Sequence, residues 1–318
     1  MVDDVKRART GSRATRIVVT GSPASRFGGG LWPGRLGKCD HAVMSERVLA
    51  RRRLANTDSM IVEDIGCAGG SPRWTPVAAD EGYAVILVRA GAFRRQAAGQ
   101  DAVIDPSGGL VSVHGVEERW AYPAGGTQRV TLIGLTREAH DEHLHDLVDW
   151  RLRTDTEFDV RHRAMLAACA RGADRFEITE RLLGLLGSLS PREDVPTGRR
   201  PGTEAAHRRL ADSVLDALSG GHLTAGLPDL AALVGASPAH LSRTFRRVTG
   251  RTLTHYRNEL RVRAVLEDLT SGAESLVALA ARYGFTDQAH LTRIVRRHAN
   301  TTPGRLRTEL STKVQAST

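Results

Sequence analysis

The chain has 318 residues, of which 41% are hydrophobic and 25% are charged, a composition typical of a globular protein with about two domains. It contains no apolar run of about 18 residues and no secretory signal, so no membrane-spanning helix is predicted and we expect a cytoplasmic protein. Cys39, Cys67 and Cys169 are few and far apart, which fits a reducing compartment.

The net charge of +9 is distributed unevenly along the chain. Residues 44–200 hold 21 Lys and Arg against 23 Asp and Glu, whereas residues 201–310 hold 15 against 10. This distribution predicts that the C-terminal region faces a polyanion. The alternative is an ordinary surface of solvated arginines.

In chain order, residues 1–43 are rich in Gly, Ser and Arg without a sustained period, which predicts a disordered leader or an over-extended start. Short β-rich runs follow between about residues 55 and 136, separated by turn residues as in an antiparallel sandwich or barrel. From residue 137 the apolar period becomes helical. We therefore predict an α+β multidomain protein in which residues 44–189 form an antiparallel β sensor domain with a helical dimerisation segment. Residues 190–206, rich in Pro, Gly and charge, are the predicted linker.

The C-terminal region contains a repeat. The stretch "AHLSRTFRR" at residues 239–247 returns as "AHLTRIVRR" at residues 289–297. In each copy a short apolar helix ends at a glycine, Gly235 or Gly284, and a second helix begins at a good N-terminal signal. This pattern predicts two helix-turn-helix motifs, at about residues 229–250 and 276–299, joined by one long helix over residues 252–272. Residues 311–318 are left as a tail.

The second helix of each copy has a basic side and an apolar side. In the second copy Leu291, Ile294, Val295 and Ala299 fall opposite the arginines, and in the first copy Leu241, Phe245 and Val248 do so. One side would pack on the motif, and the other would be free to enter the major groove of DNA. The long helix would hold the two reading helices roughly one DNA turn apart.

These residues resemble the C-terminal domain of AraC/XylS-type transcriptional regulators over residues 207–310. The resemblance is carried by "LPDLAALVGASPAHLSRTFRRVTGRT", "YRNELRVRAVLEDL" and "SLVALAARYGFTDQAHLTRIVRRHANTTPGRLR". The family usually has Phe where Leu291, Val295 and Ala299 stand, and Gly where Asn300 stands. The smaller residues predict a less tightly packed second motif, whereas Asn300 can adopt the left-handed conformation of the turn.

The resemblance implies sequence-specific promoter binding by a homodimer that responds to a small-molecule effector and activates transcription through RNA polymerase. The implied DNA-binding residues lie early in each second helix, with Arg247 and Arg297 better placed for phosphate and the two histidines for DNA or local packing. The set of the first motif is Ser237, Pro238, Ala239, His240, Ser242, Arg243, Arg246 and Arg247. The set of the second motif is Asp287, Gln288, Ala289, His290, Thr292, Arg293, Arg296 and Arg297.

The strands of residues 60–136 resemble the cupin-like sensor domain of such regulators. Metal-binding cupins have a clustered histidine set, but this region offers only His114, so no metal or other cofactor is expected. The stretch "HDEHLHD" at residues 140–146 is interpreted as solvated helix surface because His145 points away from His140 and His143 on a helix. No nucleophile motif or phosphate loop is found, so no catalytic residue is assigned. Two alternatives stay open: a cupin-type enzyme with an accessory DNA-binding domain, and a ligand-independent DNA-binding protein.

Overall fold

The computed structural model describes residues 48–123, 126–145, 147, 150–191, 201–271 and 274–310. The predicted leader at residues 1–43 and the tail at residues 311–318 lie outside this range. Within it, no helix has both the length and the apolar character needed to span a bilayer.

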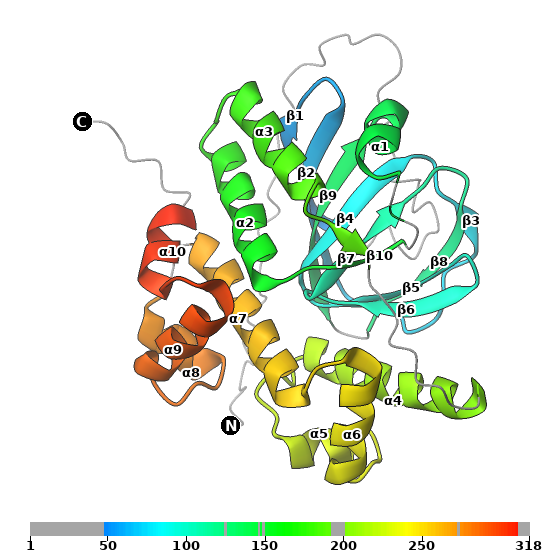
Figure 1. Cartoon of the computed structure of the whole chain (residues 1–318), viewed down its shortest axis with the longest axis vertical. Helices are drawn as coiled ribbons and strands as arrows, with labels where there is room; N and C mark the ends of the chain where they lie inside the picture. Colours follow the sequence, from blue (N-terminus) through cyan, green and yellow to red (C-terminus); the bar gives the residue numbers. More distant parts are fainter. Residues whose placement is uncertain are drawn as a thin grey trace, which may run out of the picture. The chain divides into compact units, whose positions relative to one another are not determined.

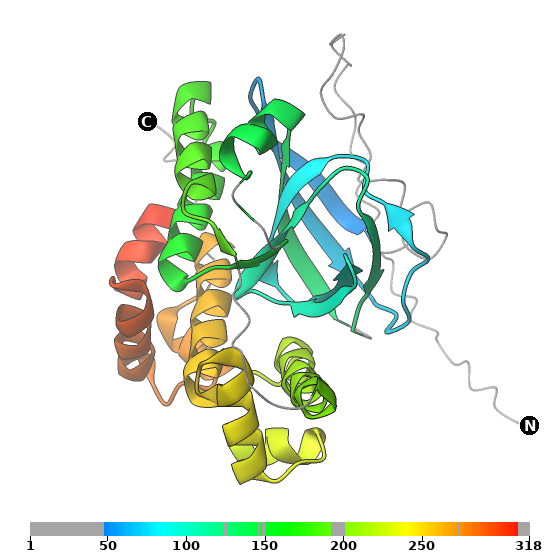
Figure 2. The ribbon, with the colours of Figure 1, turned by 45° about the vertical axis from the view of Figure 1, so that its right-hand side comes forward.

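Within the described residues, the N-terminal domain contains two antiparallel sheets (Figure 1), and Figure 2 shows them facing each other across a common interior. The larger sheet has the order β1-β2-β9-β4-β7-β10-β11, and the smaller one β3-β8-β5-β6. The strands are β1 Val48–Asn56, β2 Met60–Ala68, β3 Ala78–Ala79, β4 Tyr83–Ala90, β5 Phe93–Ala97, β6 Gln100–Ile104, β7 Gly108–Ser112, β8 Glu117–Ala121, β9 Thr127–Leu135, β10 Arg151–Arg153 and β11 Ser190–Pro191. The predicted antiparallel β domain is confirmed.

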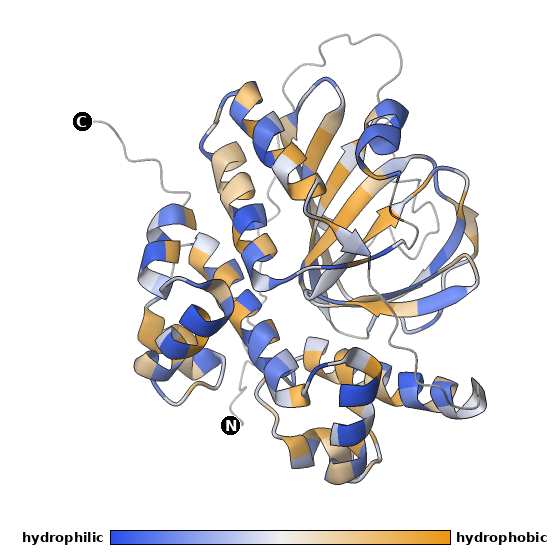
Figure 3. Cartoon of the chain, viewed as in Figure 1, coloured by the Kyte–Doolittle hydropathy of each residue, from blue (hydrophilic) through white to orange (hydrophobic). Residues whose placement is uncertain are grey.

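The alternation of side chains along the strands builds two cores. In β9, Leu132 faces the space between the sheets and packs in a cluster with Phe93 of the smaller sheet. Its neighbour Ile133 faces the other way and packs in a cluster with Met165 and Leu182 from the helices. Successive residues of a strand point to opposite faces, so one strand serves both cores. Figure 3 shows hydrophobic residues concentrated in the central strands of the larger sheet, whereas the helices carry both hydrophobic and hydrophilic residues.

Three helices follow β9 in the chain, with β10 between the first two and β11 after the third: α1 Arg137–His143, α2 Thr156–Ala170 and α3 Arg175–Leu186. Each begins at a residue whose side-chain oxygen accepts a backbone N–H of the first turn: Thr136, Asp155 and Asp174. The helical period from residue 137 is thus confirmed, but β10 and β11, which pair with each other, were not predicted. Their pairing is long-range and leaves no mark in a local period.

The stretch at residues 140–146 lies on α1 and just beyond it, with Asp146 outside the described residues. His140 packs its ring against Tyr83 at a centroid distance of 4.6 Å, so it is not simply solvated. Among the residues that the structure describes, no three His, Cys, Asp or Glu side chains are grouped so that they could hold a metal ion.

The C-terminal region is helical. Its helices are α4 Pro201–Ser219, α5 Leu227–Leu233, α6 Pro238–Thr249, α7 Leu253–Ser271, α8 Leu276–Arg282, α9 Gln288–Ala299 and α10 Pro303–Leu310. α4 begins inside the segment predicted as linker, because Pro201 can occupy the first turn of a helix. The long helix predicted at residues 252–272 is confirmed as α7.

α7 belongs to both helix-turn-helix motifs. Tyr256 and Leu260, in its first half, are buried in the core that contains α5 and α6. Val265 and Leu266, in its second half, are buried in the core that contains α8 and α9. A single rigid element therefore carries the two motifs at its two ends.

Candidate nucleic-acid interface

The start of α6 is fixed by local chemistry. Ser237 precedes the helix in an extended conformation, and its hydroxyl accepts the backbone N–H of His240 over 3.3 Å. Pro238 occupies the first helical position, where its missing N–H costs nothing. The helix ends at Gly250, whose φ of 72° is in the left-handed region.

α9 is built in the same way from different residues. The Asp287 carboxylate accepts the backbone N–H of His290 over 2.7 Å and caps the start of the helix. The helix ends at Asn300, whose φ of 53° confirms that asparagine replaces the expected glycine in the left-handed turn. Gly235 and Gly284, at the two motif turns, are also left-handed, with φ of 65° and 66°.

The apolar side of each helix is buried as predicted, apart from Val248, which is only partly buried. Leu241 and Phe245 of α6 and Leu291 and Val295 of α9 are all 0% exposed. The second motif was expected to pack less tightly because its apolar residues are smaller. The structure shows that Val160 and Ala164 of α2 also pack against the α9 cluster, so residues outside the motif contribute to its core. The looser packing of the second motif stays a prediction.

The opposite side of each helix is basic and open. Within the described residues, no side chain of the six arginines of the two helices forms an ion pair or a hydrogen bond with the protein, and neither helix contains Asp or Glu. The arginines are Arg243, Arg246, Arg247, Arg293, Arg296 and Arg297. Arg247 is half-buried and the other five are exposed. Their guanidinium donors are therefore available to an external acceptor, and no nearby carboxylate on the same helix repels a phosphate.

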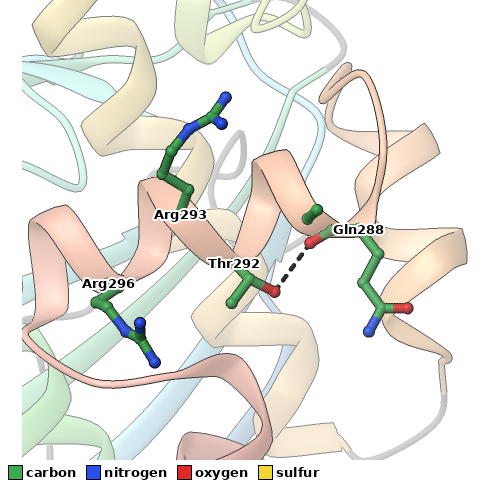
Figure 4. Close-up of a pocket in the computed structure, with 5 residues that line it drawn as sticks. Gln288, Thr292, Arg293 and Arg296 are labelled. Atoms are coloured by element: carbon green, nitrogen blue, oxygen red, sulfur yellow. Dashed lines mark hydrogen bonds between the residues drawn. The ribbon is translucent and has the colours of Figure 1, made fainter.

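α9 presents a hollow of about 530 Å³ along its open side (Figure 4). It is lined by Gln288, Ala289, Thr292, Arg293 and Arg296, all of them predicted DNA-binding residues. Figure 4 shows the polar ends of Gln288, Arg293 and Arg296 extending away from the helix. The Thr292 hydroxyl donates to the Gln288 carbonyl oxygen over 2.9 Å, which leaves its lone pairs free to accept. Donors and acceptors thus lie on one surface, as contact with base edges requires.

Some predicted residues have a structural task instead. Ser237 and Asp287 are capping residues. His290 Nδ1 accepts the backbone N–H of Thr286 over 3.2 Å, so this histidine holds the turn of its own motif. His240 is exposed, with its ring 6.1 Å from that of His207 on α4. The remaining predicted residues lie on the open sides of α6 and α9, and their contact with DNA stays a prediction.

Sequence reasoning did not find the buried charges that connect α7 with the β domain. Glu267 of α7 is 7% exposed and faces three arginines of the N-terminal domain. Its carboxylate oxygens lie 3.5 Å from Arg89 of β4, 3.0 Å from Arg129 of β9 and 3.1 Å from Arg163 of α2. Burial alone would raise the pKa of Glu267, but attraction to Arg163, Arg89 and Arg129 outweighs it and holds the pKa below its ordinary value.

One turn earlier, Arg263 makes the complementary contact. It is 1% exposed and donates to Glu259 over 2.9 Å, to the Thr154 carbonyl oxygen over 2.7 Å, and to the carbonyl oxygen of Pro106. Tyr256, two turns before, donates to Asp105. The signal in the sequence was the spacing of Glu259, Arg263 and Glu267 every four residues, which puts them in one row on α7.

Comparisons with known proteins agree with this geometry. A family described as "Helix-turn-helix domain" matches residues 230–309. The probable transcription factor PqrA of Proteus vulgaris is 38% identical over 73 residues, which are 23% of this chain and 60% of PqrA. The multiple antibiotic resistance protein MarA of Escherichia coli is 33% identical over 73 residues, 23% of this chain and 58% of MarA. The chain thus spans about three fifths of the length of these curated relatives.

Among solved structures, one from Chromobacterium violaceum, described as a transcriptional regulator with an AraC-type DNA-binding domain, is 24% identical. The match has a TM-score of 0.31 and covers 36% of this chain and 99% of that one.

Proposed function

We propose that the chain is a sequence-specific DNA-binding regulator of transcription of the AraC type, because residues 230–309 match a helix-turn-helix domain and resemble transcription factor PqrA. The observation that carries the proposal is the pair of open basic faces on α6 and α9, each with three arginines that have no partner in the described residues. α7 joins them and, with 19 residues, is about 28 Å long. This length suits two reading helices in successive major grooves on one side of a duplex.

The reading residues divide by chemistry. Arg243 and Arg293 lie early in the exposed faces and read guanine through paired hydrogen bonds, and Gln288 reads adenine in the same way. Arg247 and Arg297 lie near the helix ends and bind phosphate. The phosphate contacts supply affinity for any DNA, and the base contacts supply preference for one site.

The regulator responds to an effector bound by the N-terminal domain. The support is a row of buried polar contacts on α7. Glu267 meets arginines of β4, β9 and α2. Tyr256 contacts Asp105, and Arg263 contacts Pro106 and Thr154, in segments that join the strands of the same domain. A change in the position of these strands would move charged groups that cannot be left unpaired at low cost. The helix that carries both motifs therefore senses the state of the β domain.

The regulator acts as a homodimer through α3. Phe176 is 74% exposed and Leu183 is 38% exposed, on the side of α3 away from its own core. Gly184 lies on the same side, and a side chain added there would meet nothing within 4 Å. Two copies of α3 packed antiparallel would place each Phe176 over the partner's Gly184, which satisfies the self-complementarity of a two-fold interface. The dimer activates transcription by contact with RNA polymerase, as the family resemblance suggests.

In vitro selection from random DNA with the full chain tests the proposal. We expect enrichment of one two-segment sequence, with binding that weakens steeply as salt rises. A matched variant with Arg243 and Arg293 changed to Ala should lose the enrichment but keep part of the affinity for random DNA. Enrichment of no sequence by the unmodified chain would refute the proposal. Adding metabolite extracts to the same assay distinguishes an effector-responsive regulator from a ligand-independent binder.

A further inference from the structure

Arg261, in the middle of α7, contacts the segment that leads into the first helix-turn-helix motif and the turn of the second. The residue is 6% exposed, and its Nε donates to the carbonyl oxygen of Leu223 over 2.9 Å, in the segment that leads into α5. On its other side, the guanidinium carbon lies 5.6 Å from the centroid of the Phe285 ring, in the turn between α8 and α9. One cation therefore joins the entry of the first motif to the turn of the second.

The segment that leads into the first motif also approaches the turn of the second motif directly at this point. A Cβ added to Gly284 would lie 2.9 Å from Thr224 Cγ2 and 3.1 Å from Arg261 Nη2. Gly284 is thus required by its φ of +66° and by the close approach of the first motif. Burial, together with repulsion from Arg257, lowers the pKa of Arg261 to about 10, so the side chain remains a cation at neutral pH.

Phe285 connects Arg261 with the start of α9. Its ring is nearly perpendicular to that of His290, at 89°, with the centroids 5.6 Å apart. His290 lies in the first turn of α9, directly after Gln288 and Ala289 on the open face. The start of the second reading helix is therefore held, through two aromatic contacts, by Arg261.

We propose that Arg261 is a positioning residue that sets the spacing between the two DNA segments contacted by α6 and α9, an inference that rests on the proposed function. Each motif packs on α7 through an apolar core, and apolar contacts are non-directional. A hydrogen bond and an aromatic contact away from the helix axis add a directional restraint on rotation of one motif relative to the other. Arg261, with Leu223 on one side and Phe285 on the other, supplies it.

The test uses the full chain and the DNA site that the unmodified protein selects. Dissociation constants are measured for this site and for versions with one base pair added to or removed from the spacer. The variants are Arg261→Met, Arg261→Lys and Phe285→Leu, each checked for an unchanged thermal melting temperature. Arg257→Met is the matched control, because Arg257 lies one turn earlier and donates to the Ala225 carbonyl oxygen of the first motif.

The unmodified protein should prefer its own spacer by about tenfold or more, the factor that one charged hydrogen bond and one cation–π contact can supply. Arg261→Met and Phe285→Leu should reduce this preference to about threefold or less, and Arg257→Met should leave it unchanged. Lysine lacks the planar guanidinium group, so Arg261→Lys should show nearly the same loss of spacer preference as Arg261→Met. If Arg261→Met does not fold, Phe285→Leu decides. A folded variant of either residue with full spacer preference would overturn the inference, as would an equal loss in Arg257→Met. If the unmodified protein selects no DNA sequence, the proposed function fails and the inference fails with it; if it selects a site of one segment, only the inference fails.

Discussion

The contact between α7 and the β domain makes a strong prediction for Glu267→Gln. The carboxylate faces Arg89, Arg129 and Arg163, and their other acidic partners are Asp64 and Asp159. Glutamine has nearly the same shape but no charge, and its NH₂ group would face guanidinium donors. Three arginines, two of them almost fully buried, would then share two carboxylates.

The size of the effect follows from burial. Breaking a buried ion pair by removing one partner costs about 3–5 kcal/mol, because the other charge remains in a poorly solvated place. An exposed pair such as Glu177 with Arg181, both with side chains 40% exposed, is worth at most about 0.5 kcal/mol. Glu177→Gln on α3 is therefore the matched control, with the same chemical change in a solvated setting.

Urea denaturation of both variants measures the difference, since the unfolding free energy falls linearly with urea. Glu267→Gln should lower the unfolding free energy by about 3–5 kcal/mol and Glu177→Gln by less than about 0.5 kcal/mol. Adding Arg163→Met to Glu267→Gln should cost less than the sum of the two single changes. Equal stability of the Glu267 and Glu177 variants would refute the assignment of a buried charged contact.

Three further predictions concern DNA, pH and association. Arg243→Ala should weaken binding to the selected site by about 1–3 kcal/mol with little effect on binding to random DNA, whereas Arg247→Ala should weaken binding to both DNAs alike. Fluorescence anisotropy measures the affinity for each DNA, and an equal loss of affinity for both DNAs in both variants would contradict this division. Burial, with repulsion from Arg163, holds the pKa of His162 well below 6.5, so the unfolded chain binds a proton that the folded chain does not. The unfolding free energy should therefore fall as pH drops below about 6.5, and His162→Gln should reduce this slope between pH 7 and 5; an unchanged slope would count against it. Phe176→Ser should weaken self-association at least about tenfold in sedimentation equilibrium without changing stability, and an unaltered dimer would exclude α3 as the interface.

Local patterns in the sequence were sufficient for the helix-turn-helix motifs. Each of their main features depends on residues within a few positions in the sequence. These features are the caps at Ser237 and Asp287, the left-handed turns at Gly235 and Gly284, and the apolar side of α9. Both motifs contain the same local interactions, so the period of the apolar residues and the helix-start and helix-end signals in the sequence are enough to predict them.

Contacts between distant segments could not be predicted in this way. Arg263 has the same local surroundings in sequence as a solvated arginine, yet it is buried because Thr154, 109 residues earlier, supplies acceptors. For the same reason the sequence around Val295 does not indicate that Val160 of α2, more than 100 residues earlier, packs against the same cluster. The exposed arginines of α6 and α9 could be placed from the sequence because they recur in a regular array on one face, and Arg261 was missed because its partners lie in two other segments.

Hydroxyl-radical footprinting of the full chain on its selected site tests the central claim most directly. Two reading helices joined by α7 should protect two segments centred about 10 base pairs apart on one face of the duplex, and changing Arg293 and Arg296 to Ala should remove protection of only one. Uniform protection along the DNA, or a single protected segment that both the α6 and the α9 variants abolish together, would contradict the account.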